Sequence, residues 1–165
     1  MSSTVDVRRA EPCDLQLLPE VELAADRVFA RVGVHLPAQV SSVAELGAAA
    51  CVLVAGRPPV GFARVEVLDG QAHLEQLSVH PDHARQGLGG ALLAAAIAWA
   101  RTAGFPAMTL TTFEAVPWNG PWYRRHGFTD VQQPGPGLAQ HLRAEEQAGL
   151  GLLGRRVALH LPLHR

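Results

Sequence analysis

The chain has 165 residues, of which 48% are hydrophobic and 18% charged, and its 14 basic and 15 acidic side chains give a net charge of −1. The length fits one domain and the composition fits a globular chain, and the balanced charge excludes the excess basicity of proteins that follow a nucleic-acid backbone. All 14 basic residues are arginines, which excludes a Walker A loop and a Schiff-base lysine.

The apolar segments are short. The longest, Ala48–Ala55 and Ala91–Ala100, fall well below the roughly 20 residues needed to cross a bilayer. The N-terminal residues lack the apolar stretch and cleavage site of a secretory signal. We therefore expect a cytoplasmic protein with no membrane partner.

Cysteine and histidine spacing gives no sign of a metal centre. Cys13 and Cys51 show no metal-ligand spacing, and we expect both to be reduced structural thiols. Among the eight histidines only His80 and His83 lie close together, without further ligands nearby. The sequence therefore predicts that no metal is bound.

The first half of the chain combines helical and strand patterns. Apolar residues spaced three and four apart predict a long helix, and Ser41 or Ser42 can cap a second, short helix. Two β-branched runs separated by Gly56-Arg-Pro-Pro predict antiparallel strands. In chain order, we expect a strand, a helix, a loop, a helix and two strands at Thr4–Arg8, Asp14–Arg31, Val32–Gln39, Ser42–Ala49, Cys51–Ala55 and Val60–Leu68.

A hairpin and a bulge are predicted next. Asp69-Gly70 is a strong signal for a two-residue hairpin turn into a strand that ends at Val79. Within that strand the apolar residues change from even to odd numbers between Leu74 and Leu77. Because strand side chains alternate between faces, this change predicts a β-bulge near Glu75 and Gln76 that splays the strand from its neighbour.

The second half begins with a strong helix that ends at Gly104 in the C′ position. In chain order, we expect a helix, a strand, a short helix, an extended segment, a helix and a strand at Leu88–Ala103, Ala107–Phe113, Pro117–Arg125, Phe128–Gln132, Leu138–Ala148 and Val157–Leu163. Strands in sequence with a helix crossing between two of them predict a single α/β (α+β) domain over residues 1–165, with a mixed sheet and flanking helices.

The glycine-rich segment between the strand ending at Val79 and the helix starting at Leu88 is a candidate anion site. Gly87, Gly89 and Gly90 allow a ligand to approach the backbone closely, and the first N–H groups of the helix are unpaired at the positive end of its dipole. A pyrophosphate is the natural ligand. The dinucleotide fingerprint requires a small residue where this chain has Leu92, so a nicotinamide-dependent oxidoreductase is disfavoured.

Three blocks together resemble the GNAT superfamily of acetyl-coenzyme A-dependent N-acetyltransferases. They are Leu77-Ser-Val-His-Pro, Arg85-Gln-Gly-Leu-Gly-Gly-Ala-Leu-Leu93 and Asn119-Gly-Pro-Trp-Tyr-Arg-Arg-His-Gly-Phe128, and the resemblance extends over residues 52–131. It implies a mixed, mostly antiparallel central sheet with splayed central strands. One position departs: Ala84 stands where family members usually carry Gln or Arg, and Arg85 could compensate.

The resemblance also implies roles for particular residues. Leu77 and Val79 would bind the pantetheine arm through their main chain, the Val79 N–H would stabilise the oxyanion, and Tyr123 would protonate the departing thiolate as general acid. A phenol with a pKa near 10 is a reasonable acid for that thiolate. The remaining cofactor-binding residues would be Arg85, Gln86, Gly87, Gly89, Gly90 and Asn119.

The sequence does not decide between alternatives for the catalytic base and for the acceptor. Glu75 beside the bulge is the favoured base, acting through water, and His73 is the alternative; Thr111, Thr112 and Glu114 could line the acceptor site. The acceptor is a primary amine, small or within a peptide, and aminoglycosides, polyamines, amino acids, protein N-termini and lysines all stay open. Acetyl-coenzyme A is the cosubstrate, and a homodimer is one option for the assembly.

The alternative function is a non-catalytic acetyl-coenzyme A sensor or partner-binding module of the same fold.

Overall fold

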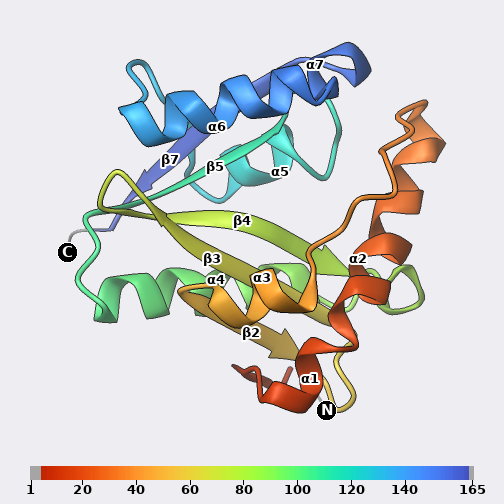
Figure 1. The fold of residues 1–165 in the computed structure, drawn as a ribbon. Helices are drawn as coiled ribbons and strands as arrows, with labels where there is room; N and C mark the ends of the chain where they lie inside the picture. Colours follow the sequence, from red (N-terminus) through yellow and green to blue (C-terminus); the bar gives the residue numbers. More distant parts are fainter. Residues whose placement is uncertain (1–4, 164–165) are drawn as a thin grey trace.

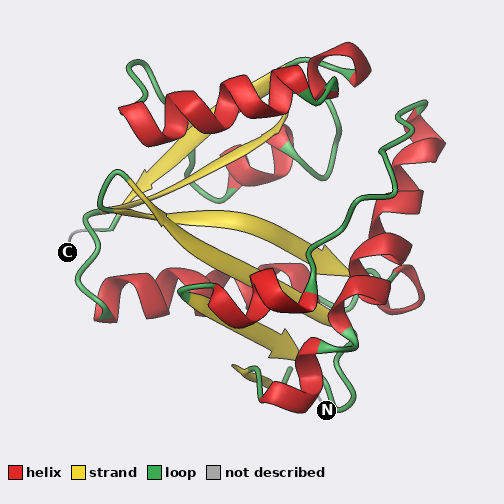
Figure 2. Cartoon of the chain, viewed as in Figure 1, coloured by secondary structure: helices red, strands yellow, loops and turns green. Residues whose placement is uncertain are grey.

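The computed structural model describes residues 5–163, which form one seven-stranded sheet of order β1-β2-β3-β4-β5-β7-β6 with helices on both faces (Figures 1 and 2). The strands are β1 (Val7–Arg9), β2 (Cys51–Ala55), β3 (Gly61–Leu68), β4 (Gln71–Val79), β5 (Ala107–Phe113), β6 (Thr129–Asp130) and β7 (Arg156–Pro162). The helices are α1 (Pro12–Leu15), α2 (Leu18–Asp26), α3 (Val43–Ala48), α4 (Leu88–Thr102), α5 (Gly120–Arg125), α6 (Pro136–Gln147) and α7 (Leu150–Leu153), with 3-10 turns η1 (Arg27–Val32) and η2 (Pro81–His83). All strand pairs are antiparallel except β4–β5, which is parallel. The predicted mixed, mostly antiparallel sheet with flanking helices is confirmed.

The predicted long helix over residues 14–31 is wrong in its continuity. The segment divides into α1, α2 and η1, and Pro19 lies in the first turn of α2. Proline has no N–H to continue a preceding helix, so α1 ends before it. The 3-10 turn then ends at Gly33, which has a φ of 78°.

Smaller differences occur at the ends of other elements. The first strand covers residues 7–9, and Thr4 lies outside the described residues. The helix predicted from Pro117 begins at Gly120, the extended segment contributes only β6, and α7 was not predicted. Ser42, and not Ser41, caps α3, accepting a hydrogen bond from the Glu45 N–H in a capping box.

Alternating side chains divide the core between the two faces of β2 and β3. Leu53 and Val65 face α4, where Leu92 and Ala96 are fully buried. The intervening residues of β2 and β3 face α2 and α3 on the opposite side, in a cluster formed by Leu18, Val21, Leu46, Val52, Val54 and Phe62. Fully burying one such aliphatic side chain contributes roughly 1.5–3 kcal/mol, so both faces hold the sheet rigidly.

The predicted bulge is confirmed, and it lies where two strands separate. Arg64 of β3 pairs with Gln76 and Val65 pairs with Leu74, so Glu75 is the extra residue of β4. On its other side β4 pairs with β5 only at Ala72 and His73. Beyond these pairs the two strands diverge as a V, with α4 beside one arm and α5 and α6 beside the other (Figure 1).

The hairpin between β3 and β4 also holds the start of α6. Asp69 and Gly70 both have positive φ, 55° and 71°, as the predicted turn requires. The Asp69 carboxylate accepts hydrogen bonds from the N–H groups of Gly137 (2.7 Å) and Leu138 (3.0 Å). A Cβ at Gly135 would lie 2.7 Å from this carboxylate, so glycine permits the close approach. The turn thereby fixes α6 over the sheet.

Two further sequence expectations concern the cysteines and membrane-spanning helices. Cys13 is exposed and Cys51 buried, both as free thiols, and burial raises the pKa of Cys51. Across residues 5–163, no helix has the length and apolar character needed to span a bilayer.

Replacing Asp69 by Asn should lower the free energy of unfolding by about 1–2 kcal/mol, because Asn keeps the positive φ but loses the charge that two N–H groups of the α6 N-terminus contact. Urea denaturation measures this difference. Asp82→Asn, an exposed carboxylate of the η2 turn, is the matched control and should change stability by less than about 0.5 kcal/mol. Equal losses in the two variants would contradict the capping role.

Candidate active site

A cleft of about 1270 Å³ lies between the diverging strands. Its walls come from α2, η1, the loop of residues 36–41, β4, the loop that precedes α4, β5, α5 and α6. The predicted site residues among its lining are Glu75, Leu77, Val79, Arg85, Gly87, Gly89, Gly90, Asn119 and Tyr123. The structure thus gathers nearly all the predicted residues around one cleft.

The main chain of β4 presents unpaired polar groups to this cleft. The His80 N–H donates to the Val60 carbonyl at 2.8 Å, toward β3. Because successive N–H groups of a strand point to opposite sides, the N–H and C=O of Val79 and Leu77 point away from β3, toward β5. Among the described residues β5 pairs with β4 only at Ala72 and His73, so these groups have no strand partner. They are available to an extended ligand.

The loop before α4 has the geometry of an anion site. Arg85 and Gly87 have φ values of 64° and 78°, and Gly87 is the N-cap of α4. The first helical hydrogen bond runs from the Ala91 N–H to the Gly87 carbonyl, which leaves the N–H groups of residues 88–90 unpaired. A Cβ would meet nothing within 4 Å at Gly90, so the backbone there is open to a ligand. These N–H groups and the helix dipole favour a phosphate.

Gln86 is the exception among the predicted cofactor residues. It is exposed and is not part of the cleft lining, whereas its neighbours Ala84 and Arg85 are. Arg85 thus lines the cleft beside the position where the family's usual Gln or Arg is missing.

Tyr123 lies in α5 and is 8% exposed, packed edge-on against Trp122 and Phe128. Burial raises its pKa well above the usual range, and the charge of Arg156 only partly opposes this. The phenol therefore stays protonated at neutral pH, and burial makes it a weaker acid than the ordinary phenol assumed from the sequence. Asn119 precedes α5, and its Oδ1 accepts a hydrogen bond from the Phe113 N–H at 3.4 Å.

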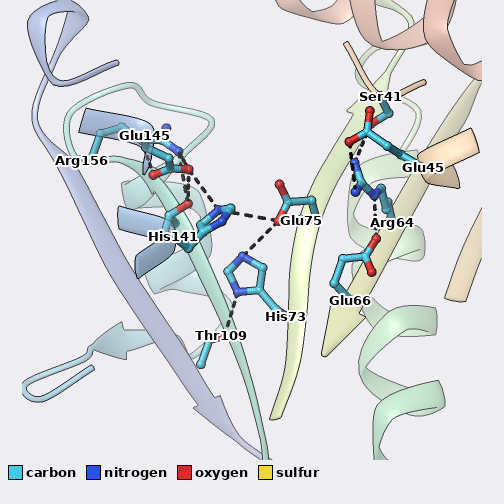
Figure 3. A network of polar contacts seen from close by, with 11 residues as sticks. Ser41, Glu45, Arg64, Glu66, His73, Glu75, Thr109, His141, Glu145 and Arg156 are labelled. Carbon is cyan, nitrogen blue, oxygen red and sulfur yellow. Dashed lines mark hydrogen bonds and ion pairs between the residues drawn. The ribbon is translucent and has the colours of Figure 1, made fainter. Parts of the chain in front are cut away.

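Glu75 lies in the cleft between two imidazoles (Figure 3). Its Oε2 is 3.4 Å from Nε2 of His73 and 3.6 Å from Nε2 of His141. Burial raises the pKa of Glu75, but the contact with His73 and the charge of His141 outweigh burial and lower it overall. Glu75 is therefore ionised at neutral pH. His73 is 1% exposed and lies behind Glu75, outside the lining.

His141 belongs to a second group of charges on α6, β5 and β7. Its Nε2 lies 3.3 Å from Glu145 Oε2, which also accepts hydrogen bonds from Arg156 Nη2 (3.0 Å) and Thr111 Oγ1 (2.8 Å). Burial alone would raise the pKa of Glu145, but these three partners lower it to about 2. In turn, the contact with Glu145 raises the pKa of His141.

The opposite wall carries two more carboxylates, from α2. Glu22 accepts hydrogen bonds from the N–H (3.0 Å) and hydroxyl (2.7 Å) of Ser41. Asp26 lies one turn further along, and burial, followed by the charge of Glu22, raises its pKa to about 7. Both residues line the cleft. Asp26 therefore changes charge near neutral pH.

The sequence analysis missed Glu22, Asp26, His141, Glu145 and Arg156, which all line the cleft. The only local signal was the spacing of His141 and Glu145, four residues apart in a predicted helix. Of the predicted acceptor residues, Thr111 and Thr112 line the cleft. Glu114 does not, and it pairs with Arg155 at 3.2 Å.

The splayed sheet, its glycine loop and the Asn119–Phe128 block define an acyltransferase architecture, and a comparison of families agrees. Residues 22–128 match the family described as "Acetyltransferase (GNAT) family". The chain belongs to the GNAT family of acetyltransferases.

Solved structures with this fold include enzymes that are named for different acceptors. The chain is similar to PaiA N-acetyltransferase from Thermoplasma acidophilum in complex with coenzyme A, with 15% identity over 97% of this chain and 99% of that one and a TM-score of 0.70. It is also similar to the ribosomal-protein-S18-alanine N-acetyltransferase from Escherichia coli (20% identity, 98% and 96% covered, TM-score 0.64). N-acetylglutamate synthase from Neisseria gonorrhoeae, solved with coenzyme A and N-acetyl-glutamate, matches at 20% identity and TM-score 0.70 over 99% of this chain and 36% of its own.

The pKa of His141 should lie above its usual value of about 6.5 and fall toward it in Glu145→Gln, because the main contact that favours the imidazolium is lost. NMR titration of the imidazole proton measures both values, and His141→Gln assigns the resonance. Since the folded-state pKa is the higher one, protonated His141 stabilises the fold below about pH 6.5, and this stabilisation disappears as pH rises through the folded-state pKa. Glu114→Gln is the control and should leave the titration unchanged. An unchanged pKa in Glu145→Gln would contradict the assigned cause.

Proposed function

We propose that residues 1–165 act as one N-acetyltransferase domain that transfers the acetyl group of acetyl-coenzyme A to a primary amine by direct attack. The observation that carries the proposal is the row of unpaired main-chain groups at Leu77 and Val79. This row lies in the same cleft as the helix-capping glycine loop and the protonated phenol of Tyr123.

The cosubstrate can be matched to the cleft part by part. The pyrophosphate is proposed to bind the free N–H groups of residues 88–90, with Arg85, Gly87, Gly89 and Gly90 around it. The pantetheine arm would then add to β4 like a short strand, bonded to the main chain of Leu77 and Val79. Asn119 would meet its thiol end. Gln86 would contribute through its backbone, since its side chain lies outside the cleft. The Thermoplasma and Neisseria structures named with coenzyme A support this choice.

The chemistry then requires a neutral amine, a stabilised oxyanion and a protonated leaving thiolate. Glu75, ionised and in the cleft, would accept the ammonium proton through a water molecule. The freed amine attacks the thioester carbonyl, and the Val79 N–H stabilises the resulting oxyanion. When the tetrahedral intermediate collapses, the C–S bond breaks, the phenol of Tyr123 gives its proton to the thiolate, and the nitrogen loses its second proton, which restores the neutral phenol and leaves a neutral amide.

Carboxylates on the acceptor side support a cationic acceptor, although Asp26, with a pKa of about 7, carries its full charge only above neutral pH. Glu22, Asp26 and Glu45 line the cleft on the side opposite α6, next to the loop of residues 36–41. A cleft lined by one sign of charge raises the local concentration of the opposite sign. Arg31 and Arg64 also line the cleft and offset part of this charge, so an amine carrying one positive centre fits better than a highly charged one.

The experiment that tests the function is a panel of amino acids, polyamines, aminoglycosides and peptides with a free N-terminus or lysine. Acetyl-coenzyme A turnover is followed by released thiol, and the exposed Cys13 supplies a constant background that protein alone corrects. Thiol release that depends on one amine, with a product heavier by one acetyl group, would support the transferase. Tight acetyl-coenzyme A binding without acceptor-dependent release on the whole panel would favour the sensor.

Tyr123→Phe separates catalysis from binding. The ring packing against Trp122 and Phe128 is kept and only the proton donor is lost, so kcat should fall by about 100-fold while the Kd of acetyl-coenzyme A stays unchanged. Steady-state kinetics and calorimetry give the two values, and the thermal midpoint checks the fold. A parental kcat across the alkaline range would remove the general-acid role.

A further inference from the structure

A cluster at the floor of the cleft has a feature that the reaction does not use. His73 is 1% exposed, and its Nε2 is a buried nitrogen without a hydrogen-bond partner. This nitrogen lies 3.4 Å from Glu75 Oε2, but the contact lacks hydrogen-bond alignment. Buried polar atoms nearly always have a hydrogen-bond partner. A buried nitrogen without one, directed at a carboxylate, therefore indicates a position where a ligand could bind.

The three side chains lie close enough together to share one metal ion. Donor atoms of His73, Glu75 and His141 all lie within 4.8 Å of one another. Tetrahedral zinc with bonds of about 2.0–2.1 Å places its ligand atoms about 3.3 Å apart. Glu75 Oε2 lies 3.4 Å and 3.6 Å from the two imidazole nitrogens, close to that spacing.

The surroundings orient these ligands. Nδ1 of His73 lies 2.8 Å from the Thr109 hydroxyl, so the ring can donate its Nδ1 proton there and leave Nε2 free to coordinate. His141 contacts Glu145, but Glu145 keeps hydrogen bonds from Arg156 and Thr111 when His141 turns to an ion. Figure 3 shows both imidazoles directed at the Glu75 carboxylate, His141 from α6 at its left and His73 from below it.

We propose that His73, Glu75 and His141 form a binding site for a divalent transition-metal ion, of the class of Zn²⁺. Two imidazoles and one carboxylate suit zinc and its neighbours, whereas Mg²⁺ and Ca²⁺ prefer oxygen ligands. Glu75 and His141 line the cleft, so the ion would be accessible from it. Sequence spacing gives no sign of such a site, because its ligands are two residues of β4 separated by Leu74 and one residue of α6, far apart in the chain.

Resting on the proposed function, the site would regulate it. An ion bound to Glu75 would hold the lone pair that the ammonium proton would otherwise take. Metal binding and amine acetylation therefore exclude one another. Zn²⁺ inhibits in competition with the amine and leaves the binding of acetyl-coenzyme A to the glycine loop unaffected.

The test titrates Zn²⁺ by calorimetry, and Co²⁺ by visible absorption, into the full chain without a histidine tag. We expect one tight site per chain and the absorption of a four-coordinate cobalt ion. His141→Gln should lose the tight site. Thr109→Val, which only frees Nδ1 of His73, should weaken it by about 10 to 100-fold. His35→Gln, an exposed histidine outside the cleft, is the matched control and should bind as the parent does.

The thermal midpoint of each variant checks that it is folded. His141→Gln changes a half-buried residue and Thr109→Val is conservative, so the two variants test the metal site independently. A parent that binds Zn²⁺ no tighter than His141→Gln, or a six-coordinate cobalt spectrum, would overturn the site. None of these readouts needs turnover, so a failure of the metal site and a failure of the acetyltransferase proposal are told apart.

Discussion

The single extra residue at Glu75 is the constraint on which the cleft depends. A bulge bends its strand and increases the local twist, and here it lies two residues beyond the last β4–β5 pair. It also restores the alternation so that Leu77 and Val79 pack their side chains toward α4 while their polar groups face away from β3. Those groups meet open space because β5 has already diverged. One inserted residue therefore both opens the gap and orients its edge.

The two arms of the V are held independently, which keeps the gap open. β5 is paired along its whole length with β7, and β4 along its length with β3, so neither arm can close without breaking a ladder. The arms join at Ala72 and His73, beside the hairpin whose Asp69 caps α6. The same hairpin thus fixes the closed end of the V and places His141 and Glu145 opposite Glu75.

Local signals were enough to predict most of the elements and the bulge, but not the composition of the cleft. The shift of apolar parity at Leu74 and Leu77, the Asp69-Gly70 turn and the glycine loop each depend on a few neighbouring residues, and the structure has all three. The break of the first helix at Pro19 is also local and could have been read from the proline. The partners of Glu75 could not: His141 lies 66 residues further along the chain, on a helix whose position depends on a side chain of a distant turn.

The charge of Glu75 is needed for both proposals, the acetyltransferase reaction and the metal site. Burial alone would favour its neutral form, and the two imidazoles, with a smaller contribution from the charge of Arg64, keep it ionised. An ionised carboxylate attracts any small cation, whether a proton, an ammonium group or a metal ion, and a metal ion also displaces the protons of the two neighbouring imidazole nitrogens. The proton and the ammonium group add one charge each, but a divalent ion also satisfies the orphaned Nε2 of His73, which neither of the others reaches. The arrangement that makes Glu75 a usable base therefore also makes it a metal ligand, and the concentration of free metal ion decides which of the two it is.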